Sequence, residues 1–84
     1  MIKKENKIEW KEVDGEAILF DEKKNEFFVL NETGTFIWKK INGKNTEKEI
    51  SSMLAKKYNK PEEKILADTK ELIKKLHSMK FIKK

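Results

Sequence analysis

The segment that decides the fold is Glu26-Phe27-Phe28-Val29-Leu30-Asn31-Glu32-Thr33-Gly34-Thr35-Phe36-Ile37-Trp38. Its first five residues are rich in aromatic and β-branched side chains, which is typical of a β-strand. Asn31 follows at the position of a helix N-cap, where its side-chain oxygen can accept a bond from a free amide of the first turn. Apolar residues at 36–38 and Ile41 then supply one face of a helix. The segment therefore predicts a strand that runs directly into a helix.

Two further strands are predicted upstream of this segment. The first is a charged stretch with apolar residues in irregular alternation, at Ile8, Trp10 and Val13. Asp14-Gly15, which follows, is a turn signal. Residues 16–20 read as the next strand, and residues 21–25 form a polar loop of hairpin length. Three strands joined by short links predict an antiparallel meander. Residues 1–7 are polar, and we expect them to be flexible.

Two further helices are predicted downstream. Asn42-Gly43 ends the first helix, and Thr46 with Glu49 forms a capping box at the start of the second. The third begins near Pro61, and its apolar stripe continues to about residue 79. Strands followed by helices indicate an α+β fold. We expect a single domain over residues 1–84, winged helix-turn-helix-like, with a three-stranded antiparallel N-terminal sheet followed by three α-helices.

Composition narrows the classes of protein. The chain has 84 residues, of which 37% are hydrophobic and 42% charged, and it has no cysteine. The lack of cysteine removes disulfides and thiolate chemistry and suits a reducing compartment. No apolar run is long enough to span a membrane, and no apolar segment follows the basic N-terminus as it would in a signal peptide. We therefore expect a cytoplasmic protein.

No catalytic constellation is visible in the sequence. His77 is the only histidine and lies beside the apolar stripe of the third helix. The serines lie in no nucleophile motif, and the aspartates are scattered over a turn, a loop and a helix. The sequence predicts no catalytic residue, no metal site and no cofactor, so we expect a binding module rather than an enzyme.

The strand at residues 26–30 is a candidate binding edge. If it lies at the edge of the meander, its unpaired backbone groups can bond to an extended peptide. Phe28 and Leu30 then fall on one face of the sheet and Phe27 and Val29 on the other. The apolar positions of the third helix span an arc of about 140°, wide enough to face the core and also line a groove. The residues alone leave a second interpretation open, in which the whole arc is core or ordinary apolar surface.

Charge raises a competing function. The net charge is +5, and the uneven distribution places −1 on residues 1–42 and +6 on residues 43–84. A basic half could attract an acidic peptide, but it also suits a winged-helix domain that binds nucleic acid. Against the second interpretation, the third helix carries four lysines and four acids, and the chain has no arginine. Nucleic-acid binding by a transcriptional regulator therefore stays as the alternative.

Several segments together resemble the PqqD-like proteins. Residues 27–34 followed by Phe36-Ile37-Trp38 resemble the strand-to-helix signature of that family. Asn42-Gly43 with Thr46 and Glu49-Ile50 resembles their next segment. Asp68, Leu72, Leu76 and Phe81-Ile82 resemble their third helix and tail. The resemblance extends from about residue 8 to 82 and lies in the order and spacing of these segments rather than in one motif.

The resemblance implies a stand-alone recognition element for ribosomally synthesised and post-translationally modified peptides. Such a protein binds the leader segment of a precursor peptide and presents it to a modifying enzyme, such as a radical S-adenosylmethionine maturase, or to a leader peptidase. In related domains the leader is an added strand between the third strand and the third helix. An open edge could also pair with a second copy of the chain. Carried over to this sequence, the implied peptide-binding residues are Phe27, Phe28, Val29, Leu30, Asn31, Asp68, Thr69, Leu72, Ile73 and Leu76, and the apolar arc of the third helix adds Leu66.

Overall fold

The computed structural model describes residues 2–3, 8–41 and 43–83. Its main sheet is antiparallel, with the strand order β2 (Ile8–Val13), β3 (Glu16–Asp21) and β4 (Glu26–Leu30). The link between β2 and β3 is the two-residue turn Asp14-Gly15, and both residues have positive φ, 52° and 83°. These angles suit the primed turns that join twisted antiparallel strands. The predicted meander is confirmed.

The three predicted helices are also confirmed, as α1 (Glu32–Lys40), α2 (Glu47–Tyr58) and α3 (Glu62–Ser78). Asn31 caps α1, since its Oδ1 accepts a bond of 2.8 Å from the Gly34 amide. Thr46 and Glu49 form the reciprocal capping box of α2. The chain thus has the predicted α+β order of three strands and then three helices.

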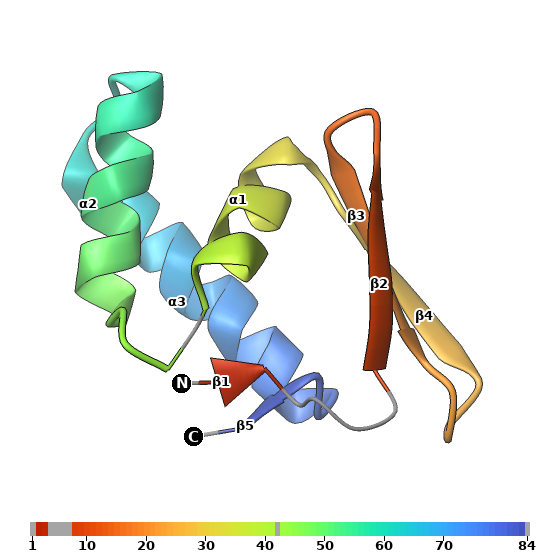
Figure 1. Ribbon diagram of the computed structural model, residues 1–84. Helices are drawn as coiled ribbons and strands as arrows, with labels where there is room; N and C mark the ends of the chain where they lie inside the picture. The colour runs from red at the N-terminus through yellow and green to blue at the C-terminus, as the bar shows by residue number, and fades with distance from the viewer. Residues whose placement is uncertain (1, 4–7, 42, 84) are drawn as a thin grey trace.

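Helix α1 occupies the centre of the molecule, between the sheet and the pair formed by α2 and α3 (Figure 1). Its Ile37 and Trp38 are almost completely buried. Only one face of the sheet points to this core, because Ala17 and Leu19 are fully buried while their neighbours Ile18 and Phe20 are partly exposed. The core therefore lies under one side of the sheet and leaves its other side uncovered among the described residues.

A second, two-stranded sheet joins the chain ends. Strand β1 (Ile2–Lys3) pairs antiparallel with β5 (Ile82–Lys83), so the two termini lie close together (Figure 1). Residues 1–7 were expected to be flexible, and their sequence did not predict this pairing; residues 1 and 4–7 lie outside the described residues. Two-residue strands carry no alternation that a sequence pattern could reveal.

Two further findings concern classes of site. Among the described residues, none of the helices combines the length and apolar character needed to cross a membrane. In the same part of the chain, no three histidine, aspartate or glutamate side chains gather as a metal site would require.

Candidate functional site

Strand β4 is an edge strand whose outward backbone groups can be identified from the register. The two-residue turn makes Val13 and Glu16 a pair that exchanges backbone hydrogen bonds. Every second residue of β3, counted from Glu16, therefore directs its backbone N–H and C=O groups toward β2. The residues between them direct their backbone groups toward β4. Their partners there direct backbone groups to β3 in return, and these partners are Glu26, Phe28 and Leu30. The N–H and C=O groups of Phe27 and Val29 consequently point to the free edge. This edge can accept another strand without disturbing the existing sheet.

Thr35 fixes the end of this edge strand against the core. Its buried hydroxyl accepts a 2.7 Å bond from the Ala17 amide and donates a 3.3 Å bond to the Leu30 carbonyl. The hydroxyl therefore continues the ladder between β3 and β4 where the chain turns into α1. The same turn brings the first residues of α1 to the edge of the sheet.

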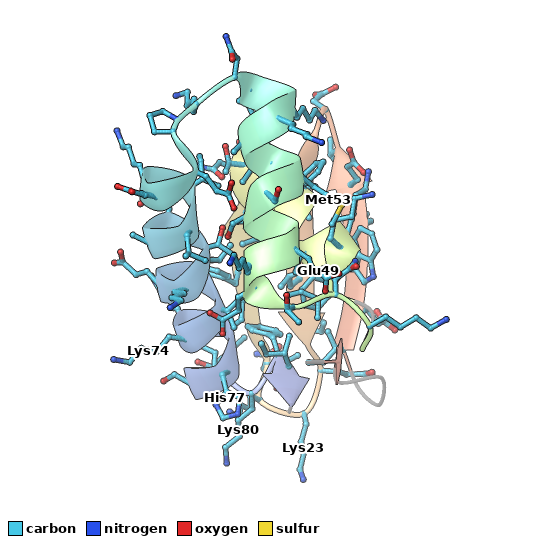
Figure 2. The ribbon with its side chains drawn as sticks, turned by 90° about the vertical axis from the view of Figure 1, so that its left-hand side faces the viewer. Lys23, Glu49, Met53, Lys74, His77 and Lys80 are labelled. Carbon is cyan, nitrogen blue, oxygen red and sulfur yellow. The ribbon has the colours of Figure 1, made fainter. Side chains whose placement is uncertain are left out.

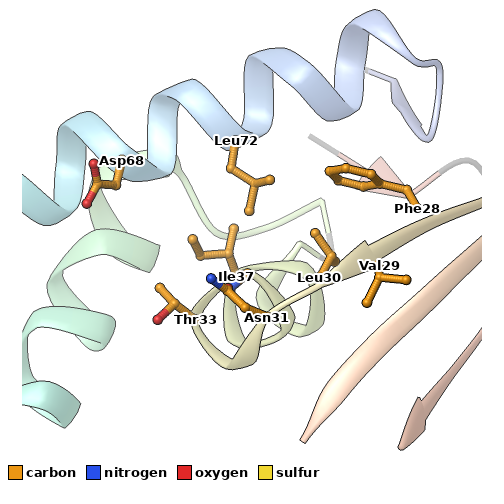
Figure 3. Close-up of a pocket in the computed structure, with 9 residues that line it drawn as sticks. Phe28, Val29, Leu30, Asn31, Thr33, Ile37, Asp68 and Leu72 are labelled. Atoms are coloured by element: carbon orange, nitrogen blue, oxygen red, sulfur yellow. The ribbon is translucent and has the colours of Figure 1, made fainter.

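A cavity of about 360 Å³ opens between β4, α1 and α3. From β4 the inward side chains Phe28 and Leu30 point toward Leu72 on α3, and Ile37 of α1 lies beneath them (Figure 3). An added strand at this edge would therefore lie between β4 and α3. The lining residues are Phe28, Val29, Leu30, Asn31, Thr33, Gly34, Ile37, Asp68 and Leu72.

The structure brings together six of the residues proposed from the sequence and separates the others. The cavity includes Phe28, Val29, Leu30, Asn31, Asp68 and Leu72. Phe27 instead points to the outer face of the sheet, where it is 67% exposed. Three residues of α3, namely Thr69, Ile73 and Leu76, lie in the core rather than along the cavity. Leu66 is half-buried about 200° around the helix from Asp68, on its other flank.

Three residues of α1 line the cavity although the sequence analysis did not propose them: Thr33, Gly34 and Ile37. A signal for them exists, because a helix that begins directly after an edge strand must place its first turn beside that edge. At Gly34 a Cβ atom would meet the Leu30 Cδ2 atom at 3.2 Å and the Asn31 Oδ1 atom at 3.3 Å. A side chain at this position would therefore crowd the end of β4 and the cap of α1.

With this geometry in view, comparison with known proteins identifies the family. The sequence model of the family described as "Coenzyme PQQ synthesis protein D (PqqD)" matches residues 16–82. The chain belongs to the PqqD family. The match contains the three elements that enclose the cavity, namely β4, α1 and α3. A search of curated proteins finds no match to the chain.

Two solved structures share the fold of this PqqD-family chain. "TbiB1 in Complex with the TbiA(beta) Leader Peptide" has a TM-score of 0.87 at 17% identity, covering 99% of this chain and 95% of that one. "Lasso peptide synthetase B1 complexed with the leader peptide" has a TM-score of 0.80 at 19% identity, covering 89% and 88%. At such low identity these likenesses establish the fold.

The two ends of the cavity in this PqqD-family protein differ in charge. Asp68 on α3 lines one end, where Asn31 and Thr33 lie on the facing wall (Figure 3). At the other end the Lys75 ammonium group lies 5.2 Å from the centre of the Phe28 ring, and that ring stacks on Phe81 with 6.4 Å between centroids. The cavity thus combines a polar, acidic end with an aromatic, basic end.

The outer face of the sheet carries another hollow, of about 290 Å³, lined by Glu9, Trp10, Lys11, Ile18 and Phe20. No helix stands opposite it in the described part of the chain, because α1 to α3 all lie on the other side of the sheet (Figure 1). A strand bound there would be supported from one side only. The cavity beside β4 is the better enclosed of the two.

His77, the only histidine, lies away from both hollows. It is exposed near the end of α3, where Figure 2 shows it with Lys74 and Lys80 on the outside of the molecule. It is not among the residues that line the described cavities. His77 therefore does not contribute to the cavity between β4 and α3.

Proposed function

We propose that this chain binds the leader segment of a ribosomally synthesised precursor peptide as an additional strand on β4. One observation carries the proposal: the free edge of β4 faces a cavity whose opposite wall is α3. Backbone bonds to Phe27 and Val29 would supply affinity that depends little on sequence. Contacts of alternate side chains with Phe28, Leu30 and Leu72 would supply selection.

Membership of the PqqD family and the two structural neighbours support this proposal. Both neighbours are described as complexes with leader peptides, and both have the same fold at high TM-scores. Helix α3, with four lysines and four acids, lacks the basic character of a recognition helix. No observation favours the nucleic-acid alternative.

The proposed role is presentation rather than catalysis. A peptide held on β4 would leave its downstream part free for a modifying enzyme, such as a radical S-adenosylmethionine maturase, or for a leader peptidase. Precursor peptides of this kind are made by cytoplasmic ribosomes, so we place the protein there. A second copy of the chain is the competing occupant of the same edge.

Leu72→Ala tests the proposal, with Leu66→Ala as its matched control. Both leucines are half-buried on α3, but only Leu72 lines the cavity. Titration with the leader of a precursor encoded beside this gene, followed by amide chemical shifts, should show binding weakened about tenfold by Leu72→Ala, because apolar contact area is lost. Leu66→Ala should lower stability and leave the affinity unchanged.

The shift pattern carries the second half of this test. In the wild-type chain, the largest shifts should fall on β4, the start of α1 and α3. Equal affinity of the two variants for the leader, or shifts confined to the outer face of the sheet, would reject the groove. Self-association is checked by repeating the measurement at several protein concentrations.

A further inference from the structure

Two residues of α3, Asp68 and Leu72, line the cavity, and the Lys75 ammonium group lies over the ring of Phe28, which also lines it. Asp68, Leu72 and Lys75 are four and three residues apart, so they lie on one side of the helix. At about 1.5 Å per residue, Leu72 lies about 6 Å and Lys75 about 10.5 Å along the axis from Asp68. A peptide in the groove would meet an acid, an aliphatic residue and a base in that order.

The acidic end lacks an internal partner. Among the described residues Asp68 makes neither an ion pair nor a hydrogen bond, although it lines the cavity. On the facing wall, the side-chain oxygen of Asn31 already accepts a 2.8 Å bond from the Gly34 amide, so the NH₂ group of Asn31 remains as a donor. Asp68 is therefore the one acceptor of full charge that this end offers to a ligand's cation.

The basic end is formed by Lys75 over the Phe28 ring at 5.2 Å. Within the described part of the chain Lys75 has no salt bridge, and its ammonium group lies over the ring of Phe28, which lines the cavity. Phe28 itself is held by Phe81, which is buried. A carboxylate on the ligand could reach this ammonium group without displacing any existing ion pair.

The sheet gives the ligand a direction. Every pair of neighbours in it is antiparallel, so we expect an added strand to run antiparallel to β4. β4 runs from Phe28 toward Asn31, which is the Asp68 end of the cavity (Figure 3). The ligand strand would therefore enter at Asp68 and leave at Lys75. Its groove-facing residues recur every second position, about 6.7 Å apart.

From these spacings we propose that the leader segment bound here has the order basic–x–apolar–x–acidic from its N-terminal side. The basic residue would meet Asp68, the apolar residue Leu72 and Phe28, and the acidic residue Lys75. On the bound strand the basic and acidic residues lie about 13 Å apart, whereas Asp68 and Lys75 lie about 10.5 Å apart along the axis of α3. The long side chain of Lys75 can span this difference. This inference rests on the proposed function and specifies the peptide that the same groove selects.

Two end-capped synthetic peptides test the order of charges. One has the sequence Ser-Gly-Thr-Lys-Thr-Leu-Thr-Glu-Thr-Gly-Ser, and the other exchanges Lys and Glu. Amide-shift titrations should show that the first peptide binds about fivefold more tightly, since exposed charge pairs contribute modestly and reversal turns two attractions into two repulsions. The preference should shrink at about 1 M salt, where the screening length is only about 3 Å.

A pair of charge-reversed variants locates the effect. Asp68→Lys with Lys75→Glu should invert the preference between the two peptides. The control, Glu63→Lys with Lys70→Glu, makes the same two changes at the same seven-residue spacing on the exposed side of α3 and should leave the preference as in the wild type. All four positions are exposed, so both double variants are expected to fold.

The possible results distinguish a wrong charge order from a failure of peptide binding on β4. Equal affinities for the two peptides, or a preference that survives reversal of Asp68 and Lys75, would overturn the charge order while shifts on β4 and α3 still supported strand addition. If neither peptide shifts the amides of β4 and α3, both the charge order and the groove are rejected.

Discussion

Two buried threonines on neighbouring helices have opposite surroundings. The Thr35 hydroxyl bonds both to the Ala17 amide and to the Leu30 carbonyl. The Thr69 hydroxyl is equally buried but has no hydrogen-bond partner among the described residues. Burial removes water from both hydroxyls. The Thr69 hydroxyl gains no hydrogen bond in exchange, whereas the Thr35 hydroxyl bonds to backbone groups that would otherwise be unpaired.

The same substitution should therefore have opposite effects at the two positions. We expect Thr69→Val to raise the free energy of unfolding by about 1 kcal/mol, and the midpoint temperature by about 4–8 °C. Thr35→Val should lower the free energy of unfolding by about 2 kcal/mol, because two buried backbone groups lose their partner. Thermal and urea unfolding followed by circular dichroism measure both, and a loss of stability in Thr69→Val would contradict the assignment.

Tyr58, the only tyrosine, gives the chain a local pH probe. Its hydroxyl donates a 3.0 Å bond to Glu32 Oε1, and this bond, followed by desolvation and the negative charge of Glu32, raises the pKa of Tyr58 above its ordinary 10.0. The protonated phenol is favoured in the folded state, so its contribution to stability is present below pH 10 and is lost as the pH rises through the folded-state value.

Glu32→Gln should bring the pKa of Tyr58 back toward 10.0, since the charge is removed while an amide oxygen can still accept the bond. The near-ultraviolet absorbance of tyrosinate reports the titration directly in each protein. An unchanged pKa in this variant would mean that Glu32 is not the cause of the shift.

Strand β4 shows how far local sequence predicts a site. The strand, its Asn31 cap and the following helix were all predicted, because each depends on side-chain shape and hydrogen bonding within a few residues. The alternation of Phe28 and Leu30 with Phe27 and Val29 was also predicted, since a strand has a period of two. The structure shows that both residues of the inward pair line the cavity, whereas of the outward pair only Val29 contributes to its lining.

Helix α3 shows where such reasoning stops. Apolar periodicity locates the centre of a buried arc, and here that centre is Thr69 and Leu76 in the core. The cavity lies at the margin of the arc, where polar side chains begin, so its wall on α3 is formed by Asp68 and Leu72, with Lys75 over the Phe28 ring beyond them. The rotation of α3 against β4 depends on packing with α1 and α2, which no single segment encodes. The β1–β5 pairing was missed for the same reason, because it joins residues at opposite ends of the chain.

Proline substitution tests which edge of the sheet receives a peptide. At Val29 a proline removes an N–H group that points to the free edge, so the ladder with β3 should survive and strand addition should fail. Glu12→Pro is the matched control, because the register places the Glu12 N–H on the free edge of β2. We expect Val29→Pro to abolish detectable binding of the leader and Glu12→Pro to retain it, as measured by amide-shift titration.

The folded state of each proline variant must be verified by its own amide spectrum before the titration. Loss of binding in Glu12→Pro with binding kept in Val29→Pro would move the site to the opposite edge. Phe28→Pro provides a reference for a broken ladder, since its N–H faces β3 and the variant should unfold.

The small size of the whole molecule and the free edge of β4 together make its stability sensitive to peptide binding. A domain of 84 residues buries a limited core, and such domains are only marginally stable. An additional strand on β4 would complete the sheet and cover the cavity between β4 and α3, so the bound form buries more apolar surface than the free one. Ligand binding should therefore appear directly as a gain in stability.

Because the groove exists only when the chain is folded, a leader that binds as proposed should stabilise the native state by mass action. At about 100 times the dissociation constant the gain is about 2.7 kcal/mol, which for a domain of this size corresponds to a rise in midpoint temperature of about 10 °C or more. The rise should grow with the logarithm of the leader concentration and be absent in Val29→Pro at the same peptide concentrations. If the midpoint temperature of Val29→Pro still rises, the stabilising contact lies away from β4. If the rise is lost in Val29→Pro and kept in Glu12→Pro, one measurement connects peptide binding and stability to the free edge of β4.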